Sequence, residues 1–108
     1  MEAAARAIAE PRRRQILELV RDEELTAGEI ARQFDVSRPA ISQHLTVLKE
    51  AGLVAERREG TRRLYRTRPE GLAGLREFLE RFWDEGLERL KAAAEREEGR
   101  KRRGSRAT

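Results

Sequence analysis

The chain has 108 residues, of which 41% are charged and 38% hydrophobic, and this length allows one small domain with a modest core. It has no cysteine, which excludes a disulfide framework, a thiolate metal site and a cysteine redox switch. Residues 1–6 lack the pattern of a signal peptide, and no apolar run is long enough to span a membrane. We therefore expect a cytoplasmic protein with no membrane partner.

The net charge of +4 is unevenly distributed along the chain. Residues 38–66 contain seven basic and three acidic residues, whereas residues 70–98 contain five basic and nine acidic residues. Residues 99–108 contain five basic and no acidic residues, and we expect them to form a disordered tail that adds non-specific affinity for DNA. A charge polarised in this way suggests a surface that binds a polyanion.

Two short helices are predicted at the N-terminus. The Ala-rich segment 2–9 forms the first, and Pro11 opens the second, which continues to residue 21. The apolar face of the second helix consists of Ile16, Leu17 and Val20. Its first turn contains Arg12, Arg13 and Arg14, although cations at this end oppose the helix dipole. These arginines are either solvated charges or contacts to phosphate, and the sequence favours neither role.

Residues 25–53 predict two helices joined by a tight turn. Thr26 and Glu29 have the spacing of a capping box at the start of the first helix. Ser37 is the predicted N-cap of the second helix, with Pro39 in its first turn and Gly52 as its C-cap. One face of the second helix is apolar and consists of Ile41, Leu45 and Leu48.

The opposite face of this second helix, which spans residues 38–51, is polar. The residues on that face, at its edge or at the N-cap are Ser37, Arg38, Pro39, Ser42, Gln43, His44, Thr46 and Lys49. Serine, threonine, glutamine and arginine are residue types that contact base edges and phosphates. A helix that packs on a preceding helix and presents such a face outward is typical of a helix-turn-helix, so we expect these residues to bind DNA. An ordinary helical hairpin with a solvated face is the alternative.

A basic β-hairpin is predicted next, over residues 54–67. Two short extended runs, 53–58 and 62–67, flank Glu59 and Gly60, and Gly60 supplies the positive φ that a tight turn needs. The arginines of the hairpin are Arg57, Arg58, Arg62, Arg63 and Arg66. A hairpin directly after a helix-turn-helix is typical of the wing of a winged helix, and we expect its arginines to reach phosphates or a minor groove. Some of them could instead only solubilise the strand edge.

One long helix is predicted over residues 70–98. Apolar residues recur in it at three- and four-residue steps and make a wider face than the core of one small domain needs. Large aromatic residues such as Phe82 and Trp83 often anchor interfaces, so we expect this helix, together with the first helix, to form a homodimer interface. The predicted interface residues are Ala4, Ile8, Leu75, Phe78, Leu79, Phe82, Trp83, Leu87 and Leu90. The alternative is a helix buried wholly in the core of one chain.

With these elements in place, the sequence resembles the ArsR/SmtB family of bacterial winged-helix repressors, and within it the branch without metal sites that includes the SdpR-type autorepressors. The segments that carry the resemblance are AEPRRRQIL at 9–17, SRPAISQHL at 37–45, VLKEAGL at 47–53, GTRRLYR at 60–66 and RFWD at 81–84. The resemblance covers about residues 7–90 and implies a homodimer, with the first and last helices at its interface, bound to a pseudo-palindromic operator in double-stranded DNA.

The metal sensors of that family carry cysteine pairs in the first helix of the motif, or histidine and acidic ligands in the last helix. Residues 29–33 here are Glu-Ile-Ala-Arg-Gln, and the single histidine, His44, lies in the second helix of the motif. We therefore expect no metal and no cofactor. The sequence has no nucleophile–base constellation and no phosphate-binding glycine loop, so an enzyme is not expected.

The predicted fold is mainly α with a small β-hairpin wing: a winged helix-turn-helix of about five helices over residues 1–98, followed by the tail. The predicted function is a homodimeric, sequence-specific DNA-binding regulator that represses its own or a neighbouring operon, with helix 38–51 in the major groove and the wing on the backbone. Two alternatives are a non-specific nucleoid-type DNA binder and a winged-helix module that binds a protein. A small organic inducer, a partner protein or the protein's own concentration could each control repression.

Overall fold

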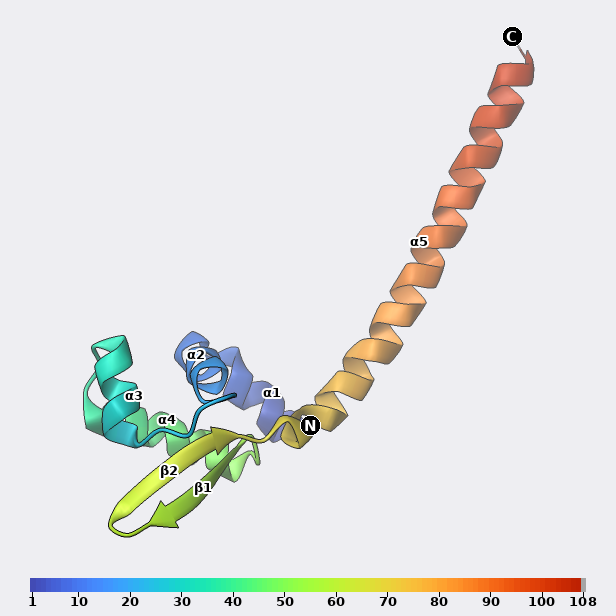
Figure 1. Cartoon of the computed structure of the whole chain (residues 1–108). Coiled ribbons are helices and arrows are strands. Elements are labelled where there is room, and N and C mark those ends of the chain that lie inside the picture. The colour runs from blue at the N-terminus through green and yellow to red at the C-terminus, as the bar shows by residue number, and fades with distance from the viewer. Residues whose placement is uncertain (108) are drawn as a thin grey trace. The chain divides into compact units, whose positions relative to one another are not determined.

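The computed structural model describes residues 1–107 and contains five α-helices, a 3-10 helix and a two-stranded sheet (Figure 1). The elements are α1 (Glu2–Ala9), α2 (Pro11–Leu19), α3 (Ala27–Phe34), α4 (Arg38–Glu50), β1 (Val54–Glu59), β2 (Arg62–Thr67), the 3-10 helix η1 (Pro69–Leu72) and α5 (Ala73–Ala107). Residues 1–75 form one compact unit, and α5 from Arg76 onward forms the second. The predicted fold class is confirmed.

The core of the first unit lies between the helices and the base of the hairpin. Its fully buried large side chains are Ile16, Val20, Ile30, Ile41, Leu45, Leu48 and Leu53. Burying such side chains is the main source of stability for the unit. Ala4 also belongs to this core, with 4% of its surface exposed, so it offers little surface to a dimer interface. Ile8 and Leu75 are half-buried.

Arginine side chains close the junction between α1 and α2. The Arg13 guanidinium donates to the carbonyl oxygens of Ala7 at 2.6 Å and Arg6 at 3.1 Å. Arg14 donates to the carbonyl oxygen of Ile8 at 2.6 Å. Carbonyls in the last turn of a helix have no partner within the helix, and cations are favourable at that end. Two of the arginines whose role the sequence left open therefore cap α1.

The third member of that cluster has a different partner. The Arg12 guanidinium lies 5.0 Å from the ring centroid of Phe34, a cation–π distance. Glu10 is the N-cap of α2 and accepts a hydrogen bond from the Arg12 backbone N–H at 3.3 Å. The helix ends at Leu19, two residues earlier than predicted, and Val20 is its C-cap.

We expect Arg13→Ala to lower the free energy of unfolding by about 1–2 kcal/mol, because the last carbonyls of α1 lose charged donors. Gln15→Ala is the matched control, since Gln15 is an exposed residue of the same helix, and we expect it to change stability by less than about 0.5 kcal/mol. Urea denaturation followed by circular dichroism measures both. Equal stability of the two variants would show that Arg13 adds nothing to the closure of α1.

Both predicted caps of the helix-turn-helix are confirmed. The Thr26 backbone N–H donates to Glu29 Oε1 at 3.0 Å, and the Glu29 backbone N–H donates to Thr26 Oγ at 3.2 Å, which makes a complete capping box at the start of α3. The Ser37 hydroxyl accepts from the Ala40 backbone N–H at 3.3 Å and caps α4. The turn between the helices places Asp35 in the left-handed region, with φ of 52°, a conformation that aspartate tolerates better than most residues.

The end of α4 is a Schellman motif. Gly52 has φ of +75°, and its backbone N–H donates to the Lys49 carbonyl at 3.0 Å. The Leu53 backbone N–H donates to the Leu48 carbonyl at 2.9 Å, which completes the motif. The C-cap itself is Ala51, one residue before Gly52, which was the predicted C-cap. Gly71 of η1 lies so close to this turn that a Cβ atom there would overlap the Gly52 carbonyl oxygen.

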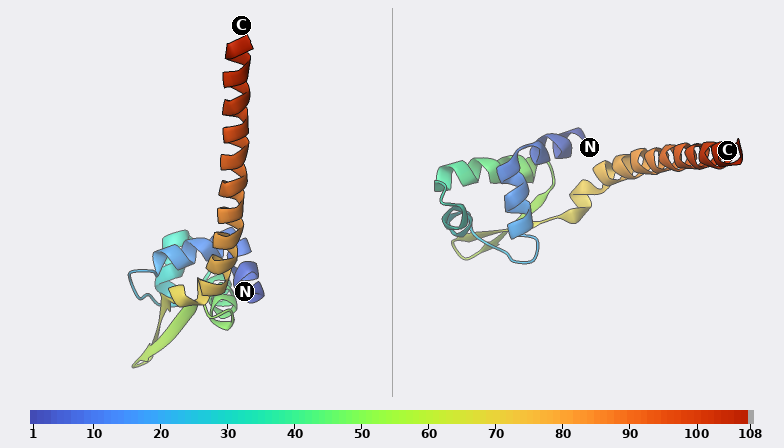
Figure 2. Two further views of the ribbon diagram at one scale, coloured as in Figure 1. Left: turned by 90° about the vertical axis from the view of Figure 1, so that its right-hand side faces the viewer. Right: turned by 90° about the horizontal axis from the view of Figure 1, so that it is seen from above.

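The two strands form an antiparallel hairpin whose register runs from Val54 opposite Thr67 to Glu59 opposite Arg62. Of the two loop residues, Gly60 has φ of +63° and Thr61 does not have a positive φ, the pattern of a type II′ turn. Both ends of β1 lie one residue later than predicted. Figure 2 shows the hairpin extending beyond the helices of the first unit.

An isolated bridge pairs β2 with the segment before α3. The Leu25 backbone N–H donates to the Tyr65 carbonyl at 3.2 Å, and the Tyr65 N–H donates to the Leu25 carbonyl at 2.8 Å. At this point β2 is hydrogen-bonded on both sides, so β1 is the outer strand of the hairpin.

Helix α5 differs from its prediction at both ends. A 3-10 turn over Pro69–Leu72 precedes it, and it continues to Ala107, whereas the sequence predicted a disordered tail from residue 99. The preceding residues 91–98 consist of lysine, alanine, glutamate and arginine, all of which favour helix, and no proline interrupts residues 73–107. Glu97 and Arg100 also form an i,i+3 ion pair at 3.7 Å.

Most of the apolar face of α5 is exposed. The exposed fractions are 43% for Phe78, 52% for Leu79, 67% for Phe82, 66% for Trp83, 48% for Leu87 and 66% for Leu90. No helix in the described part of the chain has the length and apolar character needed to cross a membrane.

Candidate nucleic-acid interface

Helix α4 has one buried and one exposed face. Ile41, Leu45 and Leu48 are buried against the rest of the unit, which fixes the orientation of the helix. Seven of the eight predicted contact residues of this helix and its N-cap are exposed: Ser37, Arg38, Pro39, Ser42, Gln43, Thr46 and Lys49. His44 is half-buried and lies at the border of the buried face, so it offers less surface to DNA than the sequence suggested.

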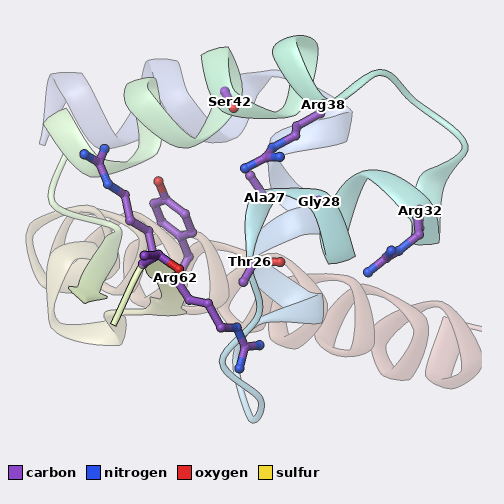
Figure 3. A pocket seen from close by; sticks show the side chains of 10 residues that line it. Thr26, Ala27, Gly28, Arg32, Arg38, Ser42 and Arg62 are labelled. Carbon is purple, nitrogen blue, oxygen red and sulfur yellow. The ribbon is translucent and has the colours of Figure 1, made fainter. Parts of the chain in front are cut away.

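A basic cleft runs between α4, the start of α3 and the hairpin. It has a volume of about 540 Å³ and is lined by Thr26, Ala27, Gly28, Arg32, Arg38, Ser42, Thr61, Arg62, Arg63 and Tyr65. Figure 3 shows Arg38 and Ser42 on α4 and Arg62 on the hairpin. Four arginines line this cleft and no acidic side chain does, so its charge suits a phosphate chain. Of these four arginines, Arg32 was not predicted from the sequence, because a single arginine on α3 does not form a pattern that indicates DNA binding.

A second groove lies along the C-terminal half of α4. It has a volume of about 500 Å³ and is lined by Ser42, Leu45, Thr46, Lys49, Glu50, Glu56, Arg63 and Tyr65. Ser42, Arg63 and Tyr65 line both hollows. The predicted recognition helix and the predicted wing therefore share one continuous surface, although they are separate segments of the sequence.

Three of the five wing arginines, Arg57, Arg62 and Arg63, are already paired with carboxylates. Arg57 contacts Glu24 at 2.9 Å and Glu59 at 3.0 Å, and Arg62 contacts Glu29 at 3.3 Å. The hydrogen bond to Glu24 is the main cause that raises the pKa of Arg57. Exposed pairs of this kind are weak, so a phosphate can replace the carboxylate. The sequence did not indicate these partners, because Glu24 and Glu29 each lie 33 positions before the arginine that they contact.

Arg58, Arg63 and Arg66 differ in their surroundings. Arg58 and Arg66 have no ion-pair partner among residues 1–100 of the structure, and Arg63 contacts Glu56 at 3.6 Å. Arg58 lies directly opposite Arg63 in the hairpin register. Like charges at opposite positions destabilise a strand pair, and an anion bound beside them would offset this repulsion.

The capping box of α3 is connected to the wing through Glu29. The hydrogen bond from the Thr26 backbone N–H is the main cause that lowers the pKa of Glu29, and Arg62 lowers it further. This carboxylate therefore stays ionised and has two roles, since it caps α3 and contacts a wing arginine.

A second carboxylate, Glu56, joins the wing to α4. Its Oε2 atom accepts a hydrogen bond from Lys49 Nζ at 3.1 Å, and its Oε1 atom lies 3.6 Å from Arg63 Nε. The Lys49 hydrogen bond is the main cause that lowers the pKa of Glu56. Tyr65 lies opposite Glu56 in the register, and burial, followed by the Glu56 charge, raises the pKa of Tyr65. In the described part of the chain, no three His, Cys, Asp or Glu side chains gather closely enough to hold a metal ion.

Comparisons with known proteins agree with this geometry. The family model described as bacterial regulatory protein, arsR family, matches residues 10–56. The chain is 51% identical over 86 residues to the HTH-type transcriptional regulator Rv2034 of Mycobacterium tuberculosis, covering 80% of each protein. It is 43% identical over 60 residues to the transcriptional repressor SdpR of Bacillus subtilis, covering 56% of this chain and 67% of that one.

A solved structure shares the fold. It is the solution structure of the homodimeric winged helix-turn-helix DNA-binding domain of Mb0332 from Mycobacterium bovis, a possible ArsR-family transcriptional regulator. This chain is 37% identical to it, with a TM-score of 0.63, and the alignment covers 78% of each chain.

Proposed function

Because this chain belongs to the arsR family of bacterial regulatory proteins, we propose that it represses its own gene or a neighbouring operon from a pseudo-palindromic operator. Like its relatives, the chain is a DNA-binding transcriptional regulator, and it is not an enzyme. The finer proposal adds that α4 enters the major groove, that the wing contacts the backbone, and that the protein acts in the cytoplasm as a homodimer.

The observation that carries the proposal is the exposed polar face of α4 beside the basic cleft. Ser42, Gln43 and Thr46 are exposed on a helix whose other face is buried. The major groove admits an α-helix, and these side chains can pair with base edges. The arginines of the cleft supply charge for phosphates on either side of that groove.

We propose that the chain forms a homodimer, which would bind the two half-sites of one operator. The α5 residues predicted for the interface are exposed, and exposed apolar patches on this scale mark interaction surfaces. Phe82, Trp83, Gly86, Leu87 and Leu90 enclose a shallow apolar hollow of about 260 Å³. We propose that a second copy of α5 covers this face. Two α4 helices would then meet major grooves about one helical turn apart.

The test is fluorescence anisotropy with the full chain across a salt series. The probes are a random duplex of about 30 base pairs and the duplex that the protein selects from a random library. Preferential binding of two protomers to the selected duplex supports the proposal. Equal, salt-sensitive binding to both duplexes favours a nucleoid-type binder, and no binding at low salt favours a protein-interaction module. Expression of a reporter behind the selected sequence separates repression from activation.

We expect Gln43→Ala and Arg63→Ala to have different effects on binding. Gln43→Ala removes a side chain suited to base edges, so the selected sequence should change at one position in each half-site. Arg63→Ala should weaken binding to all sequences alike and reduce the salt slope by about 1. Gln33→Ala, the same substitution at an exposed position of α3, serves as the control and should leave the selected sequence unchanged. Equal losses on cognate and random duplexes for both Gln43→Ala and Arg63→Ala would contradict the assigned roles.

A further inference from the structure

Glu56 is a carboxylate on a surface otherwise suited to polyanions. It lines the groove between α4 and the hairpin, and 19% of its side chain is exposed. Its two cationic partners, Lys49 and Arg63, come from the two elements proposed to contact DNA, and their side chains are 55% and 58% exposed. A fixed negative charge at this place repels phosphate, so DNA affinity alone does not account for it.

The placement of Glu56 differs from that of the other acidic residues beside the wing. Glu24 and Glu59 contact only Arg57, and Glu29 contacts Arg62 and the Thr26 backbone, so none of these contacts involves α4. Glu56 contacts one cation on α4 and one on β2. It is therefore the acidic residue, among those described, whose ion pairs connect the predicted recognition helix to the wing.

We propose that Glu56 is a positioning residue for sequence discrimination: it holds Lys49 and Arg63 in one arrangement and limits their use on DNA of random sequence. This inference rests on the proposed DNA-binding function. In a specific complex the helix and the wing occupy one defined position, and cations that are held in place beforehand lose little conformational freedom on binding. Non-specific binding depends on phosphate contacts in many positions, and reaching these requires Lys49 and Arg63 to leave Glu56.

Glu56→Gln tests this directly, because glutamine keeps the size and an acceptor oxygen but removes the charge. On the random duplex we expect the salt slope to steepen by about 1–2 and the affinity to rise about tenfold near 0.1 M salt. On the selected duplex we expect a change within about twofold, so the ratio of specific to non-specific affinity falls.

Glu50→Gln is the matched control. Glu50 lines the same groove, is exposed and has no ion pair among the described residues, so its substitution removes the same charge without releasing a cation. If Glu50→Gln and Glu56→Gln change the affinity and salt slope equally, the effect is one of net charge and the inference is overturned. Thermal unfolding of both variants checks that the fold is intact.

A second background separates positioning from a structural role. In a Lys49→Gln/Arg63→Gln protein, Glu56→Gln has no cation to release, and we expect it to leave the salt slope on the random duplex unchanged. A full effect of Glu56→Gln in that background overturns the inference. If the wild-type chain selects no sequence at all, the proposed function fails and the inference fails with it. If the wild-type chain selects a sequence but Glu50→Gln and Glu56→Gln have equal effects, the inference alone is overturned.

Discussion

We expect Gly71→Ala to lower the free energy of unfolding by about 2–3 kcal/mol. The new Cβ atom would overlap the Gly52 carbonyl oxygen and lie 3.1 Å from Leu53 Cδ2. Gly52 cannot move away easily, because its φ of +75° and its hydrogen bond to the Lys49 carbonyl end α4. The substitution therefore forces η1 away from the turn that follows the predicted recognition helix.

Thermal unfolding followed by circular dichroism measures this loss, and a fall in the melting temperature of about 10 °C or more is expected. Gly28→Ala is the matched control. A Cβ atom at Gly28 would be 4.0 Å from Thr26 Oγ, an ordinary contact, and alanine favours helix more than glycine does. We expect Gly28→Ala to leave stability unchanged or to raise it by up to about 1 kcal/mol. A Gly71→Ala protein as stable as wild type would mean that η1 can shift without cost.

We expect Phe82→Glu to weaken the proposed homodimer by about 100- to 10,000-fold. Burying a phenylalanine side chain contributes about 1.5–3 kcal/mol, and a symmetric interface contains each residue twice. The sum of the two contributions corresponds to the stated change in the dimer dissociation constant. The Phe82 ring is 67% exposed in the single chain and stacks on Phe78 with centroids 6.5 Å apart. A charge introduced there would have to be buried by the second copy.

Sedimentation equilibrium over a range of protein concentrations measures the dimer constant. Lys91→Gln changes the net charge by the same amount at another exposed position of α5 and should leave the constant unchanged. Phe82→Glu should also lose most of its preference for the selected duplex, since two linked half-site contacts become independent. Unaltered dimers of Phe82→Glu would place the interface elsewhere on the chain.

Local signals predicted most of the first unit. The capping box of Thr26 and Glu29, the N-cap at Ser37 and the turn at Gly60 each depend on residues within three positions of one another, and such patterns are legible in a sequence. The apolar spacing of α4 likewise predicted which of its faces is buried. Local chemistry was sufficient here because it agrees with the tertiary packing.

Features that depend on contacts between residues far apart in the sequence were not predictable. The contact of Gly71 with Gly52 joins backbone segments nineteen positions apart, and no composition rule indicates it. Charge counting identified the wing arginines but not the carboxylates of Glu24 and Glu29 that pair with them. Burial of Ala4 was missed for a similar reason, since alanine fits a core and a helix interface equally well. The extension of α5 past residue 98 was not predictable, because residues 99–107 combine five basic residues with two glycines and a serine and have no apolar periodicity.

The position of β1 as the outer strand has a consequence for protein handling at high concentration. Unpaired strand edges invite other chains to add to a sheet and start aggregation. Here Leu25 pairs with β2 at Tyr65, and the outer strand carries four consecutive charged residues, 56–59. Charged edges oppose strand addition. Copies of this regulator crowded on neighbouring DNA sites can therefore bring their hairpins close together and remain separate molecules.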